Sequence, residues 1–187
     1  MMWTYRTLPM ACAVAAAALL AAPPPAAATV EAQPCVRGES ETKGFSAVDS
    51  GEIRWTDKTK YDRAREHALK VWKYPGSRIT LAPDGAFTVN DLEFRDYKGS
   101  SADGAAVAFY TNDSGVGATD YITFNTTKMD GRGRDFQNSG AAHEVGHALG
   151  LCHKGDRFAT LMMKQIQTPP ITEPTSIDKA NYKRLWG

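Results

Sequence analysis

The sequence predicts a mixed α+β domain, and three observations lead to this fold class. Several short segments alternate apolar and polar side chains with a two-residue period, one run has helical periodicity, and the order is strand, helix, then four strands. The 187 residues are 42% hydrophobic and 23% charged. That length suffices for one domain with a core and is too short for two of ordinary size.

The first 28 residues are expected to be a secretory signal peptide. Arg6 is their only charged side chain, and the apolar run Met10–Ala22 is shorter than the roughly 20 residues that a membrane-spanning helix needs. Three prolines interrupt the run, and Ala26 and Ala28 then form an A-x-A cleavage site. We therefore expect cleavage after Ala28, a secreted, extracellular protein and no membrane span in the mature form.

The charge balance argues against some classes of partner. Removing the signal peptide takes away one positive charge and leaves 21 basic against 21 acidic side chains. A neutral chain has no field that would attract phosphate backbones or anionic lipid. We therefore expect no nucleic acid and no membrane surface among the partners, and we expect a monomer.

Residues 29–50 are polar and lack periodicity, which predicts a mobile N-terminal arm or a very short pro-segment. The folded domain is then expected over residues 51–187. Within residues 29–187 only Cys35 and Cys152 remain, because Cys12 leaves with the signal peptide. In an oxidising compartment these two thiols make one disulfide possible.

The folded domain is expected to begin with a strand and a helix. Ile53 and Trp55 alternate with charged neighbours, as in a half-buried strand. Thr59 then precedes Asp62 in a capping-box arrangement that predicts a helix start. The apolar face of the helical run consists of Tyr61, Ala64, Ala68, Val71 and Trp72. His67 lies off this face, so we expect it at the surface.

Four more strands are predicted before the segment that carries the chemistry. Pro75 and Gly76 end the helix. Three pairs then alternate with a two-residue period, namely Ile79 with Leu81, Leu92 with Phe94, and Val107 with Phe109. A glycine-rich segment, residues 112–118, separates them from a fifth strand around Ile122 and Phe124.

Residues 143–153 read HEVGHALGLCH and contain three of the four histidines of the chain. On a helix, His143 and His147 lie one turn apart on the same face, so both imidazoles can reach one metal ion. Gly150 is expected to end that helix, because glycine tolerates the positive φ of a C-terminal cap. The resulting turn would bring His153 to the same ion.

Three imidazoles without a fourth protein ligand leave one zinc position open for water, which is typical of a catalytic site. Glu144 points aside from the ligand direction but can touch that water and act as its general base. A zinc-bound water has its pKa lowered to about 7, and a carboxylate can take its proton and pass it to a leaving amine. The predicted chemistry is therefore hydrolysis of peptide bonds in a protein or peptide substrate, with one catalytic Zn²⁺.

Other interpretations of the motif remain open. The histidines can be ordinary core or solvated residues, or the zinc can serve structure or binding. The competing functional hypotheses are a secreted zinc-binding protein of the same fold without turnover, and a metallohydrolase that acts on a bond other than the peptide bond.

HEVGHALGLCH is similar to the H-E-x-x-H-x-x-G-x-x-H signature of the metzincin metallopeptidases. Met162 follows where that clan carries its Met-turn, although Met163 could serve, and either could simply fill the core. Within the clan, the segments HALGL and SIDKANYKRLWG and the position of Asp156 resemble matrixin-like peptidases secreted by bacteria.

The resemblance implies a twisted five-stranded sheet over a long active-site helix, followed by a C-terminal helix. It also implies that the substrate lies extended along an edge strand above the cleft. We expect residues 107–110 to form this rim, where a peptide could add as an extra strand, and an ordinary surface hairpin is the alternative.

The chain departs from the matrixin pattern near the specificity pocket. Lys154 follows the third histidine where matrixins usually have serine, and residues 164–166 replace the usual proline and aromatic. A second, structural zinc is not expected, because one histidine is left over. Cys35 has three possible states, which are a disulfide with Cys152, a thiolate on the zinc, and a free thiol.

Two segments, residues 113–120 and 130–135, have the Asp and Gly content of calcium loops. Solvated turns explain both equally well, so Ca²⁺ is possible here but has no support from the sequence.

Overall fold

The computed structural model describes residues 1–2, 30–100, 106–113 and 117–187. Within these ranges, five strands form one mixed sheet with the order β2-β1-β3-β5-β4. The strands are β1 (Glu52–Lys58), β2 (Thr80–Pro83), β3 (Leu92–Tyr97), β4 (Ala108–Thr111) and β5 (Asp120–Asn125). Neighbouring strands are parallel except for β4, which runs antiparallel to β5. The α+β class and the expected strand segments are therefore confirmed.

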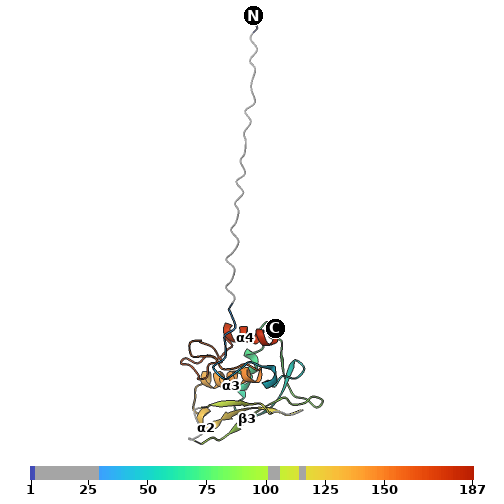
Figure 1. Cartoon of the computed structure of the whole chain (residues 1–187), viewed down its shortest axis with the longest axis vertical. Coiled ribbons are helices and arrows are strands. Elements are labelled where there is room, and N and C mark those ends of the chain that lie inside the picture. The colour runs from blue at the N-terminus through green and yellow to red at the C-terminus, as the bar shows by residue number, and fades with distance from the viewer. Residues whose placement is uncertain (3–29, 101–105, 114–116) are drawn as a thin grey trace.

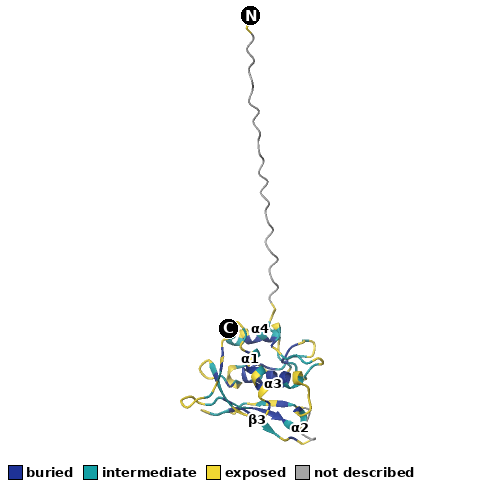
Figure 2. Ribbon diagram, turned by 180° about the vertical axis from the view of Figure 1, so that it is seen from behind, coloured by how far each residue is buried: buried dark blue, intermediate teal, exposed yellow. Residues whose placement is uncertain are grey.

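The three longer helices lie together on one side of the sheet (Figures 1 and 2). They are α1 (Asp62–Val71), α3 (Arg134–Ala148) and α4 (Ser176–Trp186), and the short elements are η1 (Lys43–Phe45) and α2 (Thr126–Met129). Helix α3 is the longest, and it lies between the sheet and α4 (Figure 1). Within the described ranges no helix combines the length and apolar character needed to cross a bilayer. The predicted signal peptide falls mainly on residues 3–29, outside the described residues.

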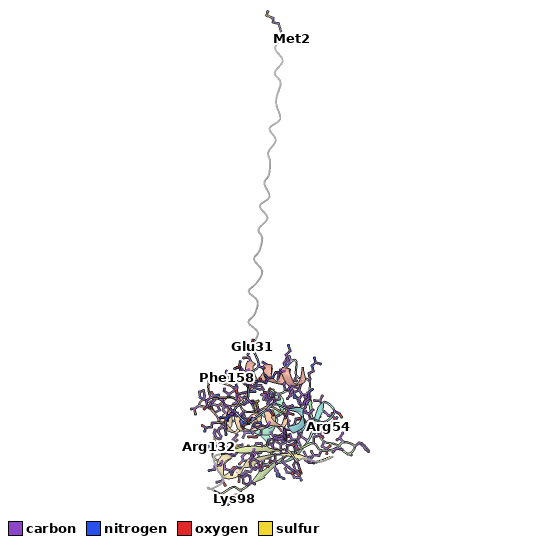
Figure 3. All side chains as sticks on the ribbon, in the orientation of Figure 1. Met2, Glu31, Arg54, Lys98, Arg132 and Phe158 are labelled. Carbon is purple, nitrogen blue, oxygen red and sulfur yellow. A yellow bond between two sulfur atoms is a disulfide. The ribbon has the colours of Figure 1, made fainter. Side chains whose placement is uncertain are left out.

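The core fills the layer between the sheet and helices α1 and α3, where side chains pack closely (Figure 3). Phe94 of β3 and Phe124 of β5 stack with ring centroids 6.4 Å apart and are both fully buried. Trp72, just after α1, donates its indole N–H to the carbonyl oxygen of Ala142 in α3 at 2.8 Å. This contact joins α1 directly to the helix that carries the histidines.

The predicted capping box at the start of α1 is wrong. The N-cap residue is Tyr61, whose side chain makes no cap hydrogen bond. The Thr59 hydroxyl accepts the N–H of Tyr61 at 3.1 Å and not that of Asp62, and it donates to Asp96 of β3. A capping box does form at α4, where Thr175 and Asp178 exchange hydrogen bonds.

The N-terminal segment, residues 33–47, is packed on the domain, so the expectation of a mobile arm is wrong for it. Its backbone N–H groups donate to the carbonyl oxygens of the turn after α3, with Val36 bonded to His153 at 3.0 Å and Thr42 bonded to Gly150 at 3.1 Å. Ala47 is buried and donates its N–H to Ala148 at 2.9 Å. A polar, aperiodic segment can dock through its backbone, and sequence periodicity does not report such contacts.

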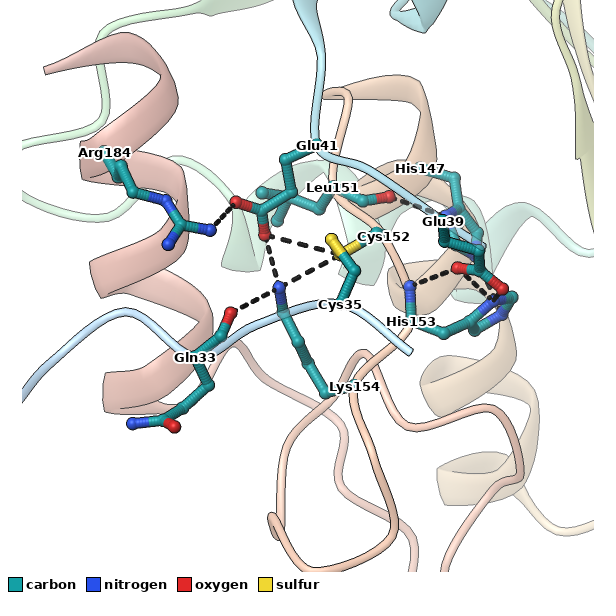
Figure 4. The surroundings of a disulfide bond; sticks show 10 residues. All are labelled: Gln33, Cys35, Glu39, Glu41, His147, Leu151, Cys152, His153, Lys154 and Arg184. Atoms are coloured by element: carbon teal, nitrogen blue, oxygen red, sulfur yellow. Dashed lines mark hydrogen bonds and ion pairs between the residues drawn. A yellow bond between two sulfur atoms is a disulfide. The ribbon is translucent and has the colours of Figure 1, made fainter. Parts of the chain in front are cut away.

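Cys35 and Cys152 form a disulfide that links the N-terminal segment to the turn after α3 across 117 positions of the sequence. Of the three states left open for Cys35, the structure has the disulfide, so Cys35 is not a thiolate ligand. Figure 4 shows the bond beside the ammonium group of Lys154 and the carboxylate of Glu41.

Lys154, the residue after His153, lies in the interior beside the disulfide. Its side chain is fully buried and donates to Glu41 at 2.5 Å, to the Gln33 carbonyl at 3.0 Å and to Cys152 Sγ at 3.1 Å. Arg184 of α4 pairs with the other oxygen of Glu41 at 2.5 Å. Burial lowers the pKa of Lys154, while the Glu41 carboxylate favours its charged form.

Replacing both cysteines with serine is expected to lower the free energy of unfolding by about 2 to 4 kcal/mol, because the disulfide restricts a long loop in the unfolded chain. Urea unfolding of the double variant and of the oxidised wild type measures this difference. Peptide mapping of the non-reduced wild type should recover the Cys35 and Cys152 peptides as one crosslinked species. Equal stability of the two proteins would contradict a stabilising role for the bond.

Candidate metal centre

Helix α3 places His143 and Glu144 on one turn and His147 on the next turn, near its C-terminal end. The helix can pack tightly on the segment below it because residue 146 is glycine. A Cβ atom there would collide with the thioether of Met162 and lie 3.0 Å from the Trp72 ring. Gly146 therefore permits the close approach of Met162 to the histidine-bearing turn.

The turn after α3 has the form that the sequence predicts. Helix α3 ends at Ala148, and Gly150 adopts a φ of +81°, in the left-handed region that favours glycine. A Cβ on Gly150 would also lie 2.5 Å from the carbonyl oxygen of Thr42 in the N-terminal segment. The turn brings His153 back beside the helix, with its Nε2 atom 3.1 Å from that of His147.

The three imidazoles converge through their Nε2 atoms. His147 Nε2 lies 3.0 Å from His143 Nε2 and 3.1 Å from His153 Nε2. Each Nδ1 atom faces an oxygen that can only accept a hydrogen bond. The Nδ1 atom of His143 lies 2.8 Å from the Leu161 carbonyl oxygen, and that of His147 lies 2.8 Å from the Leu151 carbonyl oxygen. The Nδ1 atom of His153 lies 2.9 Å from a carboxylate oxygen of Glu39. In the neutral rings the protons therefore belong on Nδ1, and three Nε2 lone pairs face one another.

Electrostatics favour the neutral, ligating form of the helical histidines. Burial lowers the pKa of His143 to about 4 and lowers that of His147 well below its ordinary value. Three lone pairs at such short separations repel unless a cation lies between them. Three neutral imidazole nitrogens suit Zn²⁺ and related transition metals, so the donor set fits the metal that the motif predicts.

Glu144 lies beside this cluster and faces a cleft of about 660 Å³ that the histidines also line. Its side chain is buried, and burial raises its pKa to about 8, opposed in part by a hydrogen bond from the backbone of Tyr110 in β4. The contact with Tyr110 ties the carboxyl group to the edge strand. Sequence analysis had no signal for it, because the two residues are distant in the chain.

The cleft lies between the edge strand and the chain after the third histidine. Residues 106–110, in and just before β4, line one side, and residues 163–166 line the other. Gly140 of α3 also lines it, and a Cβ there would lie 3.3 Å from Val107 and 3.7 Å from Ile166. Glycine at this position therefore lets the Val107 and Ile166 side chains pack close to the helix. The predicted rim residues 107–110 do lie beside the histidines.

Met162, rather than Met163, lies beneath the histidine-bearing helix. It is fully buried against residue 146, whereas Met163 lines the cleft. The segment is held by Asp178 of α4, whose carboxylate accepts the N–H groups of Leu161 at 2.9 Å and of Met162 at 3.3 Å. Asp178 thus supports the segment whose Leu161 carbonyl binds His143. Its capping box with Thr175 was a sequence signal that could have drawn attention to it.

His67, the fourth histidine, is half-buried on α1, and its Nε2 atom lies 2.7 Å from the carbonyl oxygen of Thr172. In the two candidate calcium loops, Asp120 and Asp130 have protein partners. Asp120 accepts hydrogen bonds from Asn112 and from the Asp113 N–H group, and Asp130 pairs with Lys60. Among the described residues, groups of three that could hold a metal are the histidine cluster and Cys35, Glu41 and Cys152, in which both cysteines are bonded to each other.

Comparison of the chain with models of protein families and with curated proteins finds no match to either.

Proposed function

We propose that the protein is a secreted zinc endopeptidase of the metzincin type that resembles the matrixins. The observation that carries the proposal is the convergence of three unprotonated Nε2 atoms beside a buried carboxyl group that faces a cleft. Metal-assisted hydrolysis needs a metal site and a proton-transfer group on the wall of one cavity. The three Nε2 lone pairs and the Glu144 carboxyl group suit these two roles.

His143, His147 and His153 would hold the zinc. When bound, zinc polarises a carbonyl group and lowers the pKa of a coordinated water. The three Nδ1 contacts keep each ring in the tautomer and orientation that this role needs.

Glu144 would act as the general base and then as the general acid. Burial raises the pKa of Glu144, and a zinc ion held by the three histidines would favour its ionised form. The carboxylate would then take a proton from the attacking water and pass it to the nitrogen of the leaving amine. The hydrogen bond from the Tyr110 backbone orients the carboxylate toward the cleft. Because Tyr110 belongs to β4, the strand that would bind substrate also positions the base.

The substrate would lie extended along β4. Within the described part of the chain, β4 pairs with β5 and is the last strand of the sheet order, so its other edge borders the cleft. An extended peptide can add to such an edge through main-chain hydrogen bonds, which bind many sequences.

Secretion and a monomeric state belong to the same proposal. The disulfide supports export, because such bonds persist mainly in oxidising compartments. Cleavage of casein before chelation, after chelation and after zinc is restored tests the activity. Loss and recovery of cleavage support the proposal, and a protein that binds zinc but never cleaves would favour the alternative of a binding protein.

The purified domain is expected to retain close to one zinc per chain after dialysis, because three preoriented imidazoles form a single site. Elemental analysis measured against protein concentration gives this ratio. A content below about a tenth of a zinc per chain would remove the proposed mechanism.

A further inference from the structure

The three candidate ligands differ in what holds their second ring nitrogen. His143 and His147 donate from Nδ1 to main-chain carbonyl oxygens, each at 2.8 Å. His153 donates from Nδ1 to both carboxylate oxygens of Glu39, at 2.9 and 3.0 Å. Glu39 lies 114 positions earlier in the sequence, in the N-terminal segment, and Figure 4 shows its carboxylate against the His153 ring.

We propose that Glu39 is a positioning residue of the metal centre that fixes the ring of His153 and strengthens it as a ligand. The inference rests on the proposed zinc site. A carboxylate accepts but cannot donate, so it holds the His153 proton on Nδ1 and leaves Nε2 free for the metal. Its negative charge also makes the imidazole a stronger donor, as carboxylates behind metal-bound histidines do.

His153 needs such support more than the other two ligands. The helical histidines are held by α3, whereas His153 lies in the turn after Gly150, and 23% of its side chain is exposed. Glu39 holds this residue twice, because its carboxylate also accepts the backbone N–H of His153 at 2.9 Å. The Val36 N–H donates to the His153 carbonyl at 3.0 Å, so the same segment binds both the backbone N–H and the backbone carbonyl of His153.

The disulfide keeps Glu39 in place. Cys35 is four residues before Glu39 and is bonded to Cys152, the residue immediately before His153. The disulfide therefore holds the segment that carries Glu39, the acceptor, close to the turn that carries His153, the donor. The N-terminal segment is thus a part of the metal centre, and not a pro-segment that can be removed without cost.

Zinc affinity of the mature chain, residues 29–187, tests this role. We expect Glu39→Gln to weaken zinc binding by about 10- to 100-fold, measured by competition with a chromophoric chelator. The amide keeps the size of the side chain but loses its charge and one acceptor oxygen. The matched control is Glu31→Gln, which removes an exposed carboxylate of the same chain end and should leave the affinity unchanged. Glu39→Asp retains the charge and should recover part of the affinity.

The visible absorption spectrum of the Co²⁺-loaded proteins provides a readout that general destabilisation would not move. We expect Glu39→Gln to change the band positions, since the basicity of one ligand changes, and Glu31→Gln to reproduce the wild-type spectrum. Wild-type zinc affinity and an unaltered spectrum in Glu39→Gln would overturn the role of Glu39 while leaving the metal site intact. Failure of the wild type itself to bind zinc would instead overturn the proposed function, so the two failures are distinguishable.

Discussion

Replacing Glu144 with Gln is expected to lower kcat/KM for peptide cleavage by at least about 10³-fold while zinc stays bound. An amide has the size of the carboxyl group and an oxygen that can still accept the hydrogen bond from the Tyr110 backbone. It cannot take up a proton from water. The fold and the histidine cluster should therefore persist while proton transfer is lost. Steady-state cleavage of a fluorogenic peptide, with zinc content measured on the same sample, checks both parts.

Glu173→Gln is the matched control, because it makes the same chemical change at an exposed glutamate. It should cleave at the wild-type rate. If Glu144→Gln kept more than about a tenth of the wild-type activity, Glu144 would not be the general base. If it lost zinc together with activity, the carboxyl group would instead have a role in holding the centre together.

The features that the sequence predicts well are those set by local spacing. Two-residue alternation located the strands, since a half-buried strand repeats its pattern within four to six residues. The positions of His143 and His147 on one helical face and the break at Gly150 also depend only on neighbouring residues. Such features survive into the fold because no distant contact competes with them.

The features that sequence analysis missed depend on contacts between distant residues. Lys154 stands where matrixins usually have serine, and nothing in its local sequence shows that its ammonium group is buried against Glu41 from the N-terminal segment. Glu39 has nothing in its local sequence to distinguish it from a solvated glutamate, and its role comes from docking beside the turn after α3. A single sequence carries no signal for such pairs.

The capping box shows both outcomes in one motif. At Thr59 and Asp62 the pattern is present, but the Thr59 hydroxyl accepts the N–H of Tyr61 and donates to Asp96, so the box itself does not form. At Thr175 and Asp178 the box forms, and the Asp178 carboxylate also accepts the N–H of Leu161. A local pattern therefore identifies candidates, and the tertiary partners decide which bonds are made.

His153→Ala is expected to lower zinc affinity by about 100- to 1,000-fold. Structural zinc sites with four ligands bind with roughly 10 to 16 kcal/mol, so one ligand contributes about 2.5 to 4 kcal/mol, and every 1.4 kcal/mol is tenfold. The variant should fold, because the residue lies in a turn and its side chain is partly exposed. The substitution also leaves the Glu39 carboxylate without its ring partner. We do not expect this carboxylate to replace the lost nitrogen ligand.

His67→Ala is the matched control, because it removes the remaining histidine of the chain, which is half-buried and bonded to the Thr172 carbonyl rather than to the cluster. Elemental analysis after dialysis should find close to one zinc per chain in His67→Ala and a small fraction of that in His153→Ala. Circular dichroism of both metal-free variants establishes that they share the wild-type fold. A His153→Ala protein that holds zinc as tightly as wild type would show that the third imidazole is a bystander, and the convergence of the three Nε2 atoms would then have no functional meaning.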